Sequence, residues 1–583
     1  MLHSDAPAGV PRIKVQTAFA VIVALVATLA LSLAPASAGL GASTVNASEW
    51  VIPADSHPPP PPPPPPENPG GPATPGGPAT PGGPATPGGP ATPGGPATPG
   101  GPATPGGPAT PGPCPPPCGA GAIGQVPVEQ FGQFKPGDIK AFSADTFGGF
   151  NASQVGGLDP KAMQGFKSDQ VGALPPEAMA GFSKNQFQQL PPSAMQGFKS
   201  DQIGQLPPEA MAGFNQNQMK QLPAGAMAGF NQNQFAALPP TAMQGFKSDQ
   251  VGALPPEAMA GFKPDQMKQM PPSAMQGFKS DQIGAMPPEA MAGFNQNQMK
   301  QMPPEAMAGF SPTQFAAMPP TAFAGFNPQQ IGQLSPEAMT GFKPTQVGQM
   351  PPAAFAGFSP DQMAAMPPSA MAGFKPTQMA QLPADAFAAF KPTQIDVLPP
   401  AAFAAFKADQ LGQLPPTAFT GFDSKQLAAM PPTAIAGFKP DQIGQLPADA
   451  FSAFKPTQLG QMPPAAFAGF DPTQLAAMPP TAFGGFKADQ IGQLPPEAMA
   501  GFKPTQVGTL KPDVVKALDP EQLSQLPPTA MAGFKPTQLK ALTVEQAPGL
   551  TVPQLDALSP TQVKNLPAPF VAALTDAQEA AIK

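Results

Sequence analysis

Apolar residues recur at every eighth position of this chain from Val126 to Ile582, with no insertion or deletion to interrupt the count. Within each eight-residue unit, or octad, the sixth position is also apolar, as at Phe131 and Ile139, with lapses at Ala547 and Glu579. Strict self-similarity at a short period is the signature of a repeat architecture. The pattern therefore predicts one repeat domain over residues 126–583.

Octads of two types alternate along most of this domain, so the full period is two octads. The Leu-type octad reads L-P-P-E-A-M-A-G (Leu174–Gly181), and the Phe-type octad reads F-K-P-T-Q-V-G-Q (Phe342–Gln349). The segment Met163–Phe182 recurs letter for letter at Met243–Phe262, an offset of ten whole octads. Growth by whole octad pairs indicates a role that tolerates changes in length.

A very short helix is the conformation that best fits one octad. In a continuous helix the apolar stripe would drift by about 80° per octad, and each proline would cost about 3 kcal/mol. In a strand, positions one and six would lie on opposite faces, and proline would remove ladder donors. A short helix instead places proline at its first position, between two apolar residues that form a hydrophobic staple.

The predicted helix boundaries follow from its capping residues. Ser359-Pro360-Asp361-Gln362 and Asp471-Pro472-Thr473-Gln474 have the spacing of a capping box. Glycine at position seven or eight is expected to end the helix in a left-handed conformation. Many Phe-type octads carry lysine at the cap position, where it caps poorly.

An octad cannot fold by itself. Its two large side chains contribute roughly 3–6 kcal/mol on burial, whereas ordering its backbone costs about 8–16 kcal/mol. The octads must therefore stack, and the predicted fold is an all-α solenoid of very short helices. The alternation of types suggests two octads per coil, with Leu and Met in one column and Phe in another, and a length on the order of 250 Å. The competing interpretation is a disordered proline-rich chain, against which the unbroken register argues.

The N-terminal segment has the pattern of a secretory signal. Arg12 and Lys14 precede an apolar run over residues 18–33, and Ala36-Ser37-Ala38 follows. This pattern predicts a signal peptide over residues 1–38, cleaved after Ala38. The alternative is an uncleaved membrane anchor formed by residues 18–33. In both cases the rest of the chain is expected outside the cytoplasm, either secreted or in the cell envelope.

A proline-rich stalk is predicted over residues 58–125, after a short linker over residues 39–57. Pro58–Pro66 is an unbroken proline run, and GGPATP repeats fill Gly70–Pro111. Such a segment buries nothing and stays a disordered, extended spacer. Its threonines lie beside Pro and Ala, a context that suits O-glycosylation as well as it suits an unmodified linker. They are Thr74, Thr80, Thr86, Thr92, Thr98, Thr104 and Thr110.

The stalk closes with Cys114-Pro115-Pro116-Pro117-Cys118. An extended polyproline conformation places the two Cα atoms about 12 Å apart, and a disulfide needs them within about 7 Å. An internal bridge would require a tight turn, with a cis proline as one solution. We expect interchain bridges instead, and with them a disulfide-linked homodimer.

The composition argues against an enzyme. The chain has no tyrosine, and its single tryptophan, single arginine and two histidines all precede residue 58. Those side chains, with cysteine, supply most acid–base catalysis, nucleophiles and soft-metal ligands, so we expect no catalytic residues, no cofactor and no metal. A net charge of −7 with so little arginine also argues against a nucleic-acid partner.

Charged residues fall in two rows of the two-octad period. One row holds lysine, the other glutamate, and we expect both to be solvated on opposite faces; a repetitive ligand surface is the alternative. The rows include Lys167, Lys199, Lys247, Lys263, Lys343 and Lys375, and Glu177, Glu209, Glu257, Glu289, Glu305 and Glu337.

The signal segment, the Ala/Pro/Thr-rich stalk and octads such as L-S-P-T-Q-V (Leu558–Val563) together resemble the repetitive secreted and surface proteins of bacteria. The resemblance implies no activity. It suggests a structural or adhesive array that acts as a spacer or multivalent surface, with a cell-envelope or host-surface component as partner. Membrane contact is expected only through an uncleaved N-terminal segment. The alternative is a binding module whose Met- and Phe-rich grooves take up apolar small molecules or peptides. Exposed apolar patches would favour the module, and a sealed core would favour the array.

Overall fold

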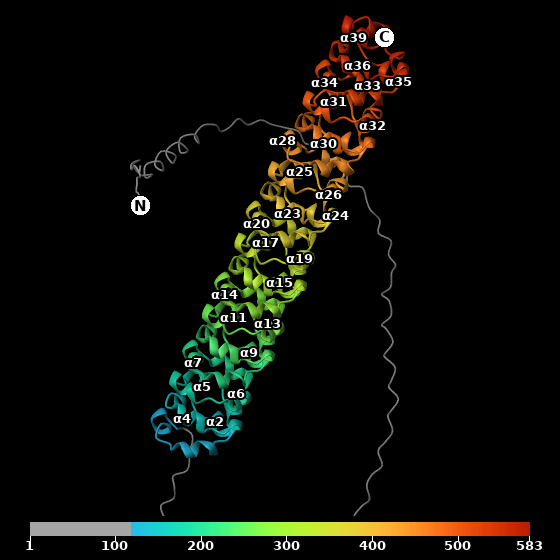
Figure 1. Cartoon of the computed structure of the whole chain (residues 1–583). Helices are drawn as coiled ribbons and strands as arrows, with labels where there is room; N and C mark the ends of the chain where they lie inside the picture. Colours follow the sequence, from blue (N-terminus) through green and yellow to red (C-terminus); the bar gives the residue numbers. More distant parts are fainter. Residues whose placement is uncertain (1–117) are drawn as a thin grey trace, which may run out of the picture. The chain divides into compact units, whose positions relative to one another are not determined.

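The computed structural model describes residues 118–583, which form a stack of short helices running from α2 (Pro136–Ala141) at one end to α39 (Asp576–Ala581) at the other (Figure 1). Every octad in this range carries one helix. Each helix begins at the third position of its octad and ends at the sixth, seventh or eighth. The described part of the chain contains no strand. The predicted all-α solenoid of very short helices is confirmed.

The helical register begins one octad earlier than the sequence analysis predicts. Helix α1 (Ala120–Ile123) occupies residues that were assigned to the disordered stalk. Cys118 takes the first position of this octad and Ile123 the sixth, and both side chains are buried. Because cysteine can serve as a small apolar residue, the octad pattern extends back across Val126.

The two octad types form different helices. All helices in register with Phe342 are α-helical, for example α19 (Pro344–Val347) and α20 (Pro360–Ala365). Most helices in register with Leu174 are 3-10 helices, for example η3 (Pro176–Gly181). In η3 the N-cap is Pro175, which has no capping side chain, and its carbonyl accepts the Ala178 N–H at 3.0 Å, three residues on. Hydrogen bonds between residues three apart are characteristic of a 3-10 helix.

The predicted capping boxes are present. The Ser359 hydroxyl accepts the Gln362 N–H at 3.3 Å, and the Gln362 side-chain oxygen accepts the Ser359 N–H at 2.9 Å. The carboxylate of Asp471 accepts the Gln474 N–H at 2.8 Å in the same way. Where lysine occupies the cap, only half of the box forms: Gln346 accepts the Lys343 N–H at 2.8 Å. Lysine has no acceptor atom to complete it.

Glycine does not end these helices in the way the sequence suggested. No described glycine has a positive φ, and each helix gives way to extended backbone at the start of the next octad, as at Phe358 (φ −72°, ψ 134°). Glycine serves close approach between turns instead. A Cβ on Gly357 would lie 2.0 Å from the carbonyl oxygen of Pro328, in helix α17 (Pro328–Gly332).

Each turn of the solenoid holds between three and four octads, not the two that the alternation of types suggested. Helices pack against helices three octads away, as α2 does against η2 (Pro160–Gly165). Buried glutamines reach 28 and 31 residues back. Because three is an odd number, a contact across three octads joins a Phe-type octad to a Leu-type octad. The two types therefore do not form separate columns. At helix spacings of 8–10 Å, turns of this size give a stack on the order of 150 Å long.

A ladder of buried glutamines links the turns. The Gln330 side-chain nitrogen donates to the carbonyl oxygens of Met299 and Met302, each at 2.8 Å, and its side-chain oxygen accepts the Asn327 N–H at 3.0 Å. Position five of the Phe-type octads is glutamine without exception from Gln154 to Gln538, and each donates to carbonyls 31 and 28 residues earlier. We call this set the glutamine ladder. No buried side-chain N or O atom among the described residues lacks a partner.

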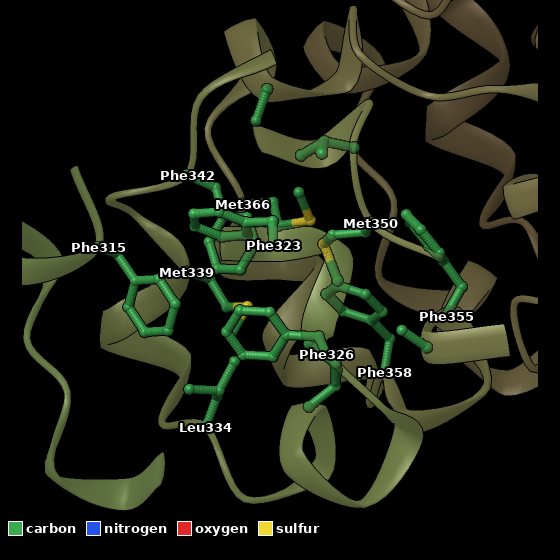
Figure 2. Close-up of a cluster of buried hydrophobic side chains, with 14 of the residues drawn as sticks. Phe315, Phe323, Phe326, Leu334, Met339, Phe342, Met350, Phe355, Phe358 and Met366 are labelled. Atoms are coloured by element: carbon green, nitrogen blue, oxygen red, sulfur yellow. The ribbon is translucent and has the colours of Figure 1, made fainter. Parts of the chain in front are cut away.

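The apolar core runs the length of the stack, between successive turns. In the cluster of Figure 2, the ring of Phe342 lies 5.1 Å from that of Phe315 and 5.4 Å from that of Phe323, both of which belong to earlier octads. Met339, Met350 and the neighbouring rings fill the space around them. Each turn therefore buries its apolar side chains against the next turn. This agrees with the expectation that one octad buries too little apolar surface to fold by itself.

Candidate functional surface

The surface of residues 118–583 exposes almost no large apolar side chain. Every methionine and phenylalanine in this range is buried. The exposed large hydrophobic residues are Val128, Val397, Val544 and Val552, at 37–45 % exposure. Three of these valines stand at the third position of an octad, where most octads have proline. The Met- and Phe-rich side chains that a groove-binding module would present lie in the core.

The charged rows are exposed, as predicted, but they do not lie on opposite faces. Glu209 and Lys263, one from each row, line the same groove. Because each turn holds between three and four octads, octads of one type do not stay on one side of the stack. The lysine row and the glutamate row therefore do not occupy separate faces. The only ion pair among the described residues joins Lys583 to Glu579 at 3.1 Å. The charges are therefore mostly solvated.

Some lysines at the cap position cap another helix. Lys343 Nζ donates to the carbonyl oxygen of Ala316 at 2.7 Å, at the C-terminal end of helix α16 (Pro312–Ala317). A cation at that end of a helix interacts favourably with its unpaired carbonyls. The same bond, across 27 residues, is made by Lys263, Lys391, Lys455 and Lys503. A residue that caps its own helix poorly thus links two turns.

The groove that Glu209 and Lys263 share has a volume of about 470 Å³ and is open to solvent. Ala212, Ala236 and Asp265 are among its other lining residues, together with several prolines. Lys263 already donates to the carbonyl of Ala236 at 2.7 Å. The side-chain nitrogen of Gln266, which also lines the groove, donates to the carbonyls of Phe235 and Leu238, each at 2.9 Å, so both nitrogen donors among the lining side chains are already bonded within the array.

No cluster of three or more His, Cys, Asp or Glu side chains able to hold a metal ion occurs in residues 118–583. Among their acidic groups, Glu545 has a lowered pKa. The main cause is a hydrogen bond from its own backbone N–H, followed by one from the Thr543 side chain. This carboxylate is fully exposed in the first turn of η19 (Val544–Gly549), where such bonds are ordinary. None of the helices between residues 118 and 583 is long and apolar enough to cross a membrane.

Of the candidate site residues predicted from the sequence, only Cys118 is described. It is 3 % exposed, its carbonyl accepts a hydrogen bond from the Thr146 hydroxyl, and it takes part in a disulfide bond. Cys114 lies outside the described residues, so an interchain bridge stays a prediction. The stalk threonines from Thr74 to Thr110, the signal segment over residues 1–38 and the linker also lie outside them.

No protein-family model matches the chain, and no curated protein is recognisably similar to it.

The glutamine ladder is the feature that sequence reasoning missed. Glutamine at position five was explained by the capping box, which glutamate would serve equally well. The Phe-type octads from Gln154 to Gln538 never use glutamate there. Only an amide can accept one bond and donate two, so this strict choice was the available signal.

Proposed function

We propose that the protein is a non-enzymatic structural spacer of the cell envelope or extracellular space, in which the helical array extends a proline-rich stalk. The observation that carries the proposal is the sealed, periodic array. Its apolar side chains are used between turns, and its polar core groups are paired with one another.

The composition of the surface favours a spacer over an adhesive. Binding hot spots in protein interfaces are enriched in Trp, Tyr and Arg. Residues 118–583 contain none of these three residue types. What they expose is mainly Lys, Gln, Asp, Glu, Thr and Ala, a mixture that keeps a long array soluble without offering a concentrated contact.

A spacer also accounts for how the chain repeats itself. The identical segments Met163–Phe182 and Met243–Phe262 record lengthening by whole octad pairs. Each added pair extends the stack without disturbing a unique site. The alternative, uptake of apolar ligands through Met- and Phe-rich grooves, would require side chains that are buried in every described octad.

The test is to change the length of the array in cells. Residues 334–429 are deleted as a block of six octad pairs, and an epitope tag is placed after Lys583. We expect both proteins to be exported, with the tag of the shortened protein about 30 Å closer to the cell surface, at 8–10 Å per turn. Retention of both proteins in the cytoplasm, or an unchanged reach, would contradict the proposal.

A further inference from the structure

Contacts in the array are strictly local along the chain. The hydrogen bonds of residues 118–583 span at most 31 residues, and the extensively packed helix pairs lie three octads apart. Aromatic ring contacts reach no further along the chain than the one between Phe315 and Phe342. Within residues 119–583, adjacent turns are therefore the units that hold each other in place.

The links between turns are nearly identical along the stack. Each Phe-type octad contributes a glutamine with two bonds to the preceding turn, and most Leu-type octads contribute a glycine in close contact with the backbone of that turn. Octads of both types bury an apolar pair at positions one and six. Equal links mean nearly equal free energies for removing any one turn. Repeat proteins of this kind follow nearest-neighbour energetics rather than a single all-or-none transition.

We propose that the array is an extensible element, which lengthens under tension by releasing one turn, or a few turns, at a time at nearly constant force, and re-forms when the load is removed. This inference deepens the proposed spacer function, because it states how the spacer responds to pulling. We expect the glutamine ladder to set the force, since a turn leaves the stack only when each ladder glutamine that it carries loses its two amide bonds to the preceding turn.

The length gained per turn is large. A turn of about 28 residues spans about 95 Å when extended and only 8–10 Å in the stack. Each released turn therefore adds about 85 Å. A spacer with this property would lengthen under load, which limits the force that reaches the attachment points at its two ends.

The experiment is optical-tweezer stretching of the full chain, with handles at its N-terminus and after Lys583. We expect a staircase or plateau in which length grows in steps of about 85 Å or small multiples of it, reversed on relaxation. A single rupture that releases the whole array at once would overturn the proposal. So would a featureless force curve without any step, which is the response of an unstructured chain.

Two variants in one octad test the role of the ladder. Gln330→Ala removes the buried amide, and Gln333→Ala removes an exposed glutamine later in the same octad. We expect Gln330→Ala to introduce one step at a visibly lower force, and Gln333→Ala to match the wild type. Identical force–extension traces for the two variants would show that the glutamine ladder does not set the unfolding force.

The measurement is made on purified protein and is independent of where the chain resides in the cell. If stretching released the array in steps but the deletion did not change the distance of the tag from the cell surface, only the spacer function would be rejected. If stretching released the whole array in one rupture but the deletion brought the tag closer to the cell surface, only the extensible element would be rejected.

Discussion

The side-chain nitrogen of Gln330 lies 2.8 Å from the carbonyl oxygen of Met299, which is 31 residues earlier in the chain. A second carbonyl, that of Met302, lies at the same distance. These two oxygens belong to the end of helix α15 (Gln296–Gln301) and to the start of the next octad, where the backbone is extended. One amide thus binds two buried acceptors of the preceding turn, and an apolar side chain at this position would remove both bonds from a site that water does not reach.

Replacing the ladder amide by a carboxyl should make stability depend on pH. In Gln330→Glu, burial and the two facing carbonyl oxygens should raise the pKa of the introduced carboxyl above its ordinary value of about 4.3. The neutral acid can still donate one bond, whereas the carboxylate repels both oxygens. The stability of the variant, relative to wild type, should be greatest below about pH 4.3 and should fall as pH rises through the raised pKa.

Thermal melts of the variant and of wild type from pH 4 to pH 8 measure this difference. The control is Gln333→Glu, at an exposed position of the same octad, which should follow wild type throughout. A constant gap between Gln330→Glu and wild type across this range would show that no buried carboxyl titrates there.

Two glycines of one octad should respond oppositely to alanine. A Cβ on Gly229 would lie 1.9 Å from the Ser200 carbonyl oxygen, whereas Gly225 has nothing within 4 Å. Gly229→Ala should cost about 1–3 kcal/mol through overpacking. Gly225→Ala should be neutral or stabilising by up to about 1 kcal/mol, because alanine favours helices. Several octads carry alanine naturally at the position of Gly229, for example those that end at Ala389, Ala405 and Ala453, so the cost should stay within this range.

Chemical denaturation of the two glycine variants gives the comparison directly. If Gly229→Ala were as stable as Gly225→Ala, the close approach between turns would have no energetic weight.

The array should tolerate deletions according to octad type. Removing Leu334–Gln349 takes out one octad of each type, so contacts across three octads still join unlike types. Removing Leu334–Gly341 places two Phe-type octads in succession, and the mismatch should cost about 1–3 kcal/mol over one turn before alternation resumes. Removing Leu334–Glu337 breaks the octad itself and should split the array into two blocks that melt separately.

Thermal melts should therefore rank the deletion of an octad pair as the mildest and the deletion of half an octad as the most severe. Hydrogen exchange should show that the single-octad deletion lowers amide protection only in the turns beside the junction. Equal melting of all three variants would mean that the chain keeps no register.

The local structure was largely predictable from sequence, because it depends on neighbours within one octad. Proline at position three fixes where a helix begins, and the capping boxes at Ser359 and Asp471 formed as their spacing required. The start of the array was missed because Cys118 was interpreted only as a disulfide cysteine, although it also fills an apolar position.

The size of a turn could not be obtained from the same pattern. A two-octad alternation is compatible with any stacking in which unlike octads meet, across one octad or across three. The sequence period reports only which types alternate, whereas the number of octads per turn depends on how Gly357 and Pro328 approach and where the Gln330 amide reaches. Those are contacts between residues of different turns, and the repeat pattern does not determine them.

The most direct test of the account is the distance between spin labels on neighbouring turns. With Cys114 and Cys118 replaced by serine, labels are placed at exposed Thr321 and Thr345, three octads apart, or at Thr345 and exposed Asp361, two octads apart. The helices of the first pair, η10 (Pro320–Gly325) and α19, are in contact, so electron paramagnetic resonance should give a short, narrow distance for it and a longer one for the second pair. A shorter distance for the pair two octads apart would restore two octads per turn, and broad distributions that grow with sequence separation would mean that the array does not fold.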